Sequence, residues 1–555
     1  MSALDEPIFN AADLVDVLPE SRFEKFEQVL ARLSDRLNPI LVKEARQALR
    51  SKQFTTTFFL MLAAGWTWSI LGLALLGPSA YYNAEGPRMF FVYYMILAAP
   101  LLIVIPYYAY TSLSAERQDR TYELVSITAL SARHILAGKL CGSGLQMLVY
   151  LSALFPCLAF TYLLRGLDIF SVFLAVAYTC LLSIGLAMVG LLLAALAPSR
   201  QRQMAQGVLF AIALCYAFGL HVAMMSTFVG TQGALWETQE FWEVNGWLAL
   251  LYVNSFALVF LGARSLLTSV CQNRSTALRV ALVSAQLSFT GWATWAALKW
   301  DNGVLYGLVF VSTVGWYFAG ALMVGESPVL SARVRRDLPQ SGLARMFLTW
   351  FNPGPATGYA FAVTNLIAVA VMATFLANGE FYDLVLLTGA TAHPSPRAAS
   401  TEIFEASLAG VSYLAIYLGL GKLILGAVRR YDEIRLTVRV LVHVLLVLAG
   451  GGIPWIIQIT YPPTRNAGYT LMQITNPVWT LWEYCTSAGL PPVTASVLLF
   501  VLPLTALVVW ALNFPGLAAE LRQVRVAVPT RVAEEDSELA AAKAPELART
   551  SPWDE

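Results

Sequence analysis

The segment Ile169–Leu196 reads IFSVFLAVAYTCLLSIGLAMVGLLLAAL and contains no charged side chain. A helix of about twenty apolar residues crosses the hydrocarbon core of a bilayer, so this segment predicts a transmembrane helix. Arg165–Asp168 separate it from another apolar stretch upstream. The two stretches together are too long for one crossing, and we predict two spans here.

The rest of the chain has the same character, because 57% of its residues are hydrophobic and only 13% are charged. A soluble domain carries about 25% charged residues. We therefore predict an all-α polytopic membrane protein with about twelve transmembrane helices. The predicted spans are 56–77, 89–113, 139–164, 169–196, 204–228, 246–269, 277–298, 303–325, 356–377, 405–427, 436–459 and 493–514.

Basic residues predict the orientation of these spans, because short cytoplasmic loops are enriched in Lys and Arg. Alternate predicted loops carry such clusters, for example Arg333, Arg335 and Arg336. Both termini are therefore predicted to be cytoplasmic, in a multi-pass protein of the cell (inner or plasma) membrane. Segment 1–36 is rich in acids and lacks the basic start and apolar stretch of a secretory signal, so we expect it to stay in the cytoplasm.

Several function classes are disfavoured. The net charge of +1 argues against a nucleic-acid partner. The six cysteines form no CxxC pair and the four histidines have no metal-ligand spacing, so we expect no metal site.

The sequence has no GxxxxGK[ST] motif, so we expect no ATP site in this chain. No Asp or Glu lies well inside a predicted span, which disfavours an ion-driven transporter. The exceptions among titratable groups, His221 and His443, are interpreted as packing histidines.

Two features concern helix packing. Pro100 and Pro106 in the second span, and Pro156 in the third, predict kinks. A seam of small residues in the fourth span predicts close contact with another helix. The seam consists of Ser183, Ala187, Gly190 and Ala194.

The segment Leu37–Arg50 reads LNPILVKEARQALR and predicts a basic amphipathic helix. Such a helix is expected to lie in the inner membrane interface, where anionic headgroups attract it. The alternative is a cytoplasmic extension of the first span. The residues assigned to this interfacial helix are Lys43, Glu44, Arg46 and Arg50.

The loop after the second predicted span, Ser112–Leu140, reads SLSAERQDRTYELVSITALSARHILAGKL. Charges cluster at its start, and Ser131 is a candidate N-cap for the helix that enters the third span. We predict two short helices joined by a turn; the alternative is a solvated charged connector. A pattern runs through this loop: Glu116-Arg117, Thr121-Tyr122-Glu123-Leu124, Thr128-Ala129-Leu130-Ser131, Ile135 and Gly138-Lys139-Leu140.

This pattern resembles the cytoplasmic loop of ABC-2 type transporter permeases, although Arg120 replaces a usual glycine and Ala129 a usual proline. The resemblance covers roughly residues 37–270, and Asn38-Pro39 is similar to the start of the family's elbow helix. It implies that loop 114–138 holds a coupling helix that docks into a separate ATPase, which would carry the ATP and Mg²⁺. The residues implied in this contact are Glu116, Arg117, Arg120, Thr121, Glu123, Thr128, Ser131 and Arg133.

An aromatic segment on the predicted outer side, Gly230–Trp247, reads GTQGALWETQEFWEVNGW. Trp236, Phe241 and Trp242 alternate with acids, as in the aromatic belt of a membrane interface. The resemblance offers an alternative, a re-entrant outer helix that lines the exit of a pathway.

The predicted organisation is a cytoplasmic segment 1–36, a permease-like six-helix domain 37–270, a second six-helix region 271–518 and a disordered cytoplasmic tail 519–555. The second region shows no clear repeat of the first. The leading hypothesis is the permease subunit of an ATP-driven exporter, not itself an enzyme. Its expected partners are the bilayer, a separate ABC ATPase and a second permease, as a homodimer or heterodimer.

Two alternatives remain. One is a membrane-embedded enzyme that acts on lipid-linked substrates through acids on the outer side. The acids available for that chemistry are Glu380, Asp383, Glu402 and Glu405. The other alternative is an ion-coupled secondary transporter.

Overall fold

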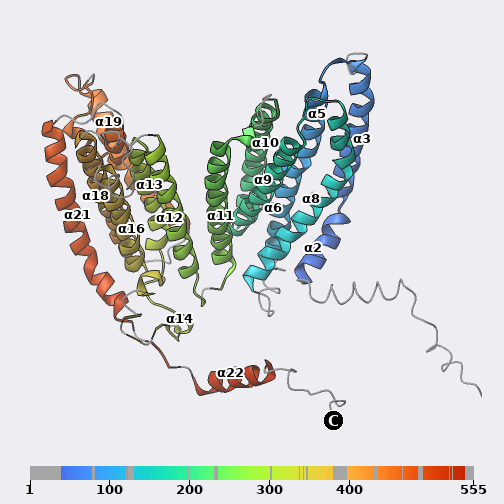
Figure 1. Cartoon of the computed structure of the whole chain (residues 1–555). Helices are drawn as coiled ribbons and strands as arrows, with labels where there is room; N and C mark the ends of the chain where they lie inside the picture. Colours follow the sequence, from blue (N-terminus) through green and yellow to red (C-terminus); the bar gives the residue numbers. More distant parts are fainter. Residues whose placement is uncertain are drawn as a thin grey trace, which may run out of the picture. The chain divides into compact units, whose positions relative to one another are not determined.

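The computed structural model describes residues 39–543, except for 78–81, 120–121, 123–130, 198, 231–234, 270, 301–302, 337, 340, 342, 345–347, 379–396, 430–435, 466, 486–491, 524 and 528. Within this described part the regular secondary structure is entirely helical (Figure 1). The prediction of an all-α polytopic membrane protein is confirmed.

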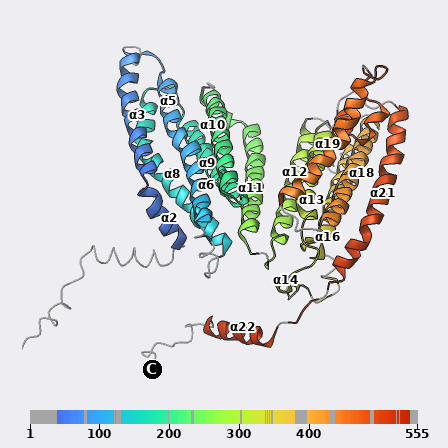
Figure 2. The ribbon, with the colours of Figure 1, turned by 180° about the vertical axis from the view of Figure 1, so that it is seen from behind.

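Eleven of the described helices are long and apolar enough to cross a membrane (Figure 2). Each predicted span forms a helix, but α12, Thr276–Lys299, falls outside these eleven although it has 24 residues. Its polar positions bond to other helices. The Gln286 amide donates to Ser312 Oγ (3.0 Å) and accepts from Trp316 Nε1 (3.0 Å). Polar side chains that are satisfied in this way lower the hydropathy of α12 without exposing unpaired groups to lipid.

The chain divides into two compact units. The first runs to Glu243 and includes Gly262–Leu267; the second comprises Val244–Leu261 and the chain from Thr268 onward. One long helix, α11 (Gln239–Leu267), contributes to both units.

The first part of the chain, up to residue 267, forms long helices and a few short helical elements. They are α2 Pro39–Leu49, α3 Lys52–Leu76, α5 Gly86–Ala99, the π-helical turn η1 Pro100–Val104, α6 Ile105–Gln118, α8 Ala132–Leu163, α9 Ile169–Leu196, α10 Arg200–Gly230, the 3₁₀ turn η2 Leu235–Glu237 and α11 Gln239–Leu267.

After α12, the second unit continues with further long helices and several short ones. They are α13 Val304–Val324, α14 Ala332–Arg336, η3 Thr349–Phe351, α16 Pro355–Ala377, α18 Arg397–Val428, α19 Leu436–Thr460, η4 Leu471–Thr475, α20 Pro477–Cys485, α21 Pro492–Leu521 and α22 Thr530–Lys543.

The two units repeat one pattern of helix neighbours. In each, the second long helix contacts the first, third, fourth and fifth, and the fourth contacts the third and fifth. The second helix is α5–η1–α6 in the first unit and α13 in the second. The units differ at their sixth helix, because α21 packs closely against α16 and α18. The described packing therefore shows a repeat that the sequence did not reveal.

The second helix of the first unit contains the predicted irregularity. The Ile105 amide donates to the Pro100 carbonyl, five residues earlier, as in a π-turn. Pro106 has no amide proton for the next bond of that kind, which would go to the Leu101 carbonyl. Ser183 on α9 donates to this carbonyl instead (2.6 Å). A neighbouring hydroxyl thus satisfies the group that the proline leaves unpaired.

The small-residue seam of α9 packs against α6, as predicted. All four of its members are buried. At Gly190 a Cβ atom would lie 2.9 Å from the Pro106 carbonyl oxygen and 3.1 Å from the Phe210 ring. Glycine at this position therefore permits the close approach of the two helices.

The predicted outer loop 460–492 is partly folded. Its elements η4 and α20 pack against the long helices of the second unit, with α20 contacting α13, α18 and α19. Tyr413 on α18 donates to the Ile474 carbonyl (2.7 Å), and Thr480 bonds to both Tyr413 (3.0 Å) and Tyr469 (2.6 Å). These buried hydrogen bonds satisfy the backbone of a segment too short to cross the membrane.

The prediction of a disordered tail is corrected in part, because Thr530–Lys543 forms α22. Its sequence, TRVAEEDSELAAAK, is rich in Ala and Glu, which favour helices. Arg531 and Glu535 form an i,i+4 ion pair (3.7 Å). The strong helix propensity of this segment and its i,i+4 ion pair explain why it is helical although it has too few large apolar residues to form a core.

We expect Gly190→Ala to destabilise the first unit by about 1–3 kcal/mol, because the new methyl group overlaps the Pro106 carbonyl. Thermal unfolding of the protein in detergent measures the change. Gly219→Ala is the matched control, since nothing lies within 4 Å of its Cβ position and alanine favours the helix. Equal melting temperatures for the two variants would contradict the close contact.

Candidate functional site

The loop predicted to couple to an ATPase has a buried lysine at its base. Lys139, near the start of α8, has a side chain that is only 2% exposed. Its Nζ donates to Glu44 Oε1 (2.8 Å) and Ser112 Oγ (2.7 Å) and pairs with Glu116 Oε2 (3.1 Å). An ammonium group has three protons, and each has a partner here. The contact joins α2, α6 and α8.

Glu116 extends this contact to a second lysine. While one of its carboxylate oxygens pairs with Lys139, the other accepts from Lys43 Nζ (2.6 Å). Partial burial would lower the pKa of Lys43, but the hydrogen bond that Lys43 donates to Glu116 and the charges of Glu116 and Glu44 raise it. We call this set of five residues the base network: Lys43, Glu44, Ser112, Glu116 and Lys139.

The helix α2 presents two different faces. Ile40, Glu44 and Ala48 recur every four residues and are buried, and α2 packs against α8. The basic residues Lys43, Arg46 and Arg50 are exposed. The sequence assigned Glu44 to this helix but did not place it in a buried ion pair. The signal was present, because helical spacing puts Glu44 on the apolar face.

Two further residues attach the first part of the loop to other helices. Arg117 donates to the carbonyls of Ala194 (3.1 Å) and Ala195 at the end of α9. Tyr122 donates to the Leu267 carbonyl (2.7 Å) at the end of α11. A cation at a helix C-terminus is favourable because the last carbonyls lack helical partners.

The remaining predicted contact residues are only partly described. Ser131 caps α8 as predicted, because its Oγ accepts from the His134 amide, and both Ser131 and Arg133 are exposed. The other members of the predicted set lie outside the described residues. These are Arg120, Thr121, Glu123 and Thr128.

The aromatic segment before and within the start of α11 forms a small cluster around Asp168. Trp236 Nε1 donates to the Asp168 carboxylate (2.9 Å), and Trp242 Nε1 donates to the Trp236 carbonyl (2.7 Å). Phe170 packs edge-on against Trp236, with ring centroids 4.9 Å apart. Phe241 and Trp242 lie in the first turns of α11, which is continuous from Gln239. The described residues after 234 thus form a short 3₁₀ turn and the start of α11, and contain no separate re-entrant helix.

The second unit anchors its corresponding connection with a buried arginine. Arg279 on α12 is fully buried and pairs with Glu326, just after α13 (2.8 Å). It also donates to the carbonyls of Trp350 (2.7 Å) and Gly354 (3.3 Å), immediately before α16. Glu326 accepts in turn from the Gly354 amide (2.8 Å). The connection 325–354 is thus tied to the first helix of its unit.

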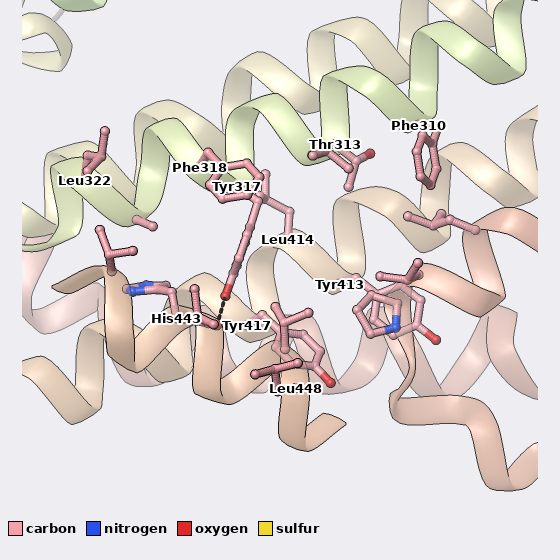
Figure 3. Close-up of a pocket in the computed structure, with 18 residues that line it drawn as sticks. Phe310, Thr313, Tyr317, Phe318, Leu322, Tyr413, Leu414, Tyr417, His443 and Leu448 are labelled. Carbon is pink, nitrogen blue, oxygen red and sulfur yellow. Dashed lines mark hydrogen bonds between the residues drawn. The ribbon is translucent and has the colours of Figure 1, made fainter. Parts of the chain in front are cut away.

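An apolar cavity of about 340 Å³ lies among α13, α18, α19 and α20 (Figure 3). Figure 3 shows Tyr317, Tyr413 and Tyr417 around it, with His443 at one end. Tyr317 donates to the His443 carbonyl (3.1 Å), and His443 Nδ1 lies 2.8 Å from the Arg439 carbonyl. Most of the lining is aliphatic or aromatic, so the cavity suits an apolar group such as an acyl chain.

Two of the titratable residues considered for the alternative functions, Glu402 and His221, make contacts. Glu402 accepts from the Tyr306 hydroxyl (2.9 Å), whereas Glu380 and Asp383 lie outside the described residues. His221 Nε2 lies within hydrogen-bond distance of Tyr94 (2.9 Å) and Thr179 (3.0 Å).

Among the described residues, no group of His, Cys, Asp and Glu side chains is arranged to hold a metal ion. Comparison with models of known protein families, with characterised proteins and with solved structures gives no match.

We expect Lys139→Met to destabilise the first unit by about 3–5 kcal/mol, because it leaves the Glu44 carboxylate buried without its partner. Thermal unfolding in detergent measures the loss. Adding Glu44→Gln in the same chain should recover part of it, since the orphaned charge is then removed. If the single and double variants unfold alike, the buried pair has no such role.

We also expect the contact between Asp168 and Trp236 to weaken in acid. Burial raises the pKa of Asp168, but hydrogen bonds from Ser171 and Trp236 outweigh this effect and lower it below its usual range. The contact is therefore fully present above about pH 4 and is lost as the pH falls through the lowered pKa. The fluorescence difference between the wild type and Trp236→Phe should change in that range. In an Asp168→Asn background the same difference should not depend on pH.

Proposed function

We propose that the chain is the membrane-spanning permease subunit of an ATP-driven, ABC-type exporter, coupled to a separate ATPase through loop 114–138. The observation that carries the proposal is the base network. A loop that transmits force must be held firmly where it enters the membrane domain. Here buried ion pairs hold both ends of the loop, at Glu116 and Lys139.

The network also explains how a movement of the loop would reach several helices. Separating Lys139 from Glu44 and Glu116 in a medium of low dielectric constant is costly. A displacement of the loop would therefore move α2, α6 and α8 together and leave their contacts intact. Arg117 and Tyr122 would pass the same movement to α9 and α11.

The ion-coupled alternative receives less support. Glu116 and Glu520 lie in the last turns of their helices, and each accepts hydrogen bonds. Ion-driven transporters usually place such groups near the membrane midplane. An energy source outside this chain agrees better with that arrangement.

The repeated helix neighbours favour a chain that carries two permease units. A single copy would then supply both six-helix halves, in place of the homodimer or heterodimer expected from the first half alone. Native mass spectrometry of the purified complex distinguishes these arrangements. One copy of this chain for two ATPase copies supports a double permease, and two copies support the dimer.

The coupling proposal is tested by co-purification with the ATPase in mild detergent. We expect the charge reversals Arg120→Glu and Glu123→Arg to lower the recovered ATPase about tenfold. Glu237→Lys, on the opposite end of the first unit, is the matched control and should have no effect. If no ATPase binds, or if the loop variants match the control, the proposal fails.

The same preparations address the alternatives. Substrate uptake driven by an imposed ion gradient in ATP-free vesicles would establish a secondary transporter. Loss of a lipid-linked product after Glu402→Gln, with ATPase binding unchanged, would favour the enzyme.

A further inference from the structure

A cavity of about 570 Å³ opens at the end of the second unit where the connection 325–354 lies. It is formed by the ends of α13, α18 and α21 and the start of α16. Basic residues from three segments line it: Arg335 on α14, Lys422 on α18 with Arg429 just after that helix, and Arg522 just after α21. Gly426 and Gly516 leave room between them. Segments far apart in the sequence thus direct cations to one space.

The described lining residues include a single carboxylate, that of Glu520. It is buried and accepts from the backbone amides of Ala356 (2.9 Å) and Thr357 (2.8 Å). Its oxygens therefore accept hydrogen bonds from the first backbone amides of α16. Among the described lining residues, Lys422, Arg429 and Arg522 outnumber this one carboxylate, so the described lining carries a net positive charge.

Neutral groups hold two of these cations in place. Lys422 Nζ donates to the Asn513 carbonyl (3.2 Å) and lies 5.8 Å from the centre of the Tyr359 ring. Arg429 donates to the carbonyls of Gly325 (3.2 Å) and Glu326 (2.6 Å). Carbonyls orient an ammonium or a guanidinium without neutralising it. Each group also has more protons than these bonds use.

We propose that this cavity binds a phosphate-bearing anion. One guanidinium group can donate two parallel hydrogen bonds to two oxygens of a phosphate, and a lysine ammonium adds a further positive charge. The volume lies in the range of small-ligand sites, about 300–1,000 Å³. The phosphate belongs either to the headgroup of an anionic phospholipid or to a soluble compound. In both cases Lys422 and Arg522 bind it.

Native mass spectrometry of the full-length chain, released from nanodiscs, tests the lipid source. Nanodiscs of phosphatidylglycerol are compared with nanodiscs of phosphatidylcholine. Binding of radioactive inorganic phosphate in equilibrium dialysis tests the soluble source. The variants are Arg522→Gln, whose exposed side chain contributes little to the fold, and the double variant Lys422→Met/Arg522→Gln. Arg525→Gln and Arg333→Gln are matched controls, because both arginines are exposed and neither lines the cavity.

Each removed charge should weaken binding about fivefold, so that the double variant loses about 25-fold. Loss of phosphatidylglycerol in the cavity variants alone supports the proposal with a lipid ligand. Loss of inorganic phosphate in the same variants supports it with a soluble ligand. If both probes bind the cavity variants and the controls equally, or bind neither the wild type nor the variants, the proposal is overturned.

Discussion

A buried charge in a medium of low dielectric constant must have partners, and Lys139 imposes this constraint on the first unit. Its ammonium needs Glu44, Ser112 and Glu116 around it. These residues come from α2, α6 and α8, so the packing of the three helices at this end follows from one ion cluster. Helix α2 is therefore part of the ion cluster that joins these helices.

The second unit meets the same constraint with different residues. Arg279 comes from the first helix of its unit, whereas Lys139 comes from the third. Both lie beside the connection between the second and third helices, and both pair with a carboxylate near the end of the second helix. The two ion pairs therefore occupy equivalent places in the repeated pattern of helix neighbours. Because the anchors use different positions, a comparison of the sequences alone does not reveal the relation.

The sequence predicted the features that depend on local patterns. Apolar length predicted the spans, Ser131 was recognised as a cap, and Pro100 marked the irregular turn. The buried state of Glu44 was missed, because Glu44 was assigned to the helix without being placed on its apolar face. The fold of α20 was missed for a different reason. Its stability depends on hydrogen bonds to distant residues such as Tyr413, which no local pattern shows.

The π-turn at Pro100–Val104 has a consequence for helical phase. Each residue of an α-helix advances the direction of the side chains by about 100°. The extra residue in this wide turn therefore sets the angle at which the following part of the helix presents Glu116. A regular α-helix through the same residues would advance one residue further over this stretch and rotate Glu116 by about 100°, away from Lys139. The irregular turn thus sets the angle between the side chains of α5 and those of α6 that reach the ion cluster.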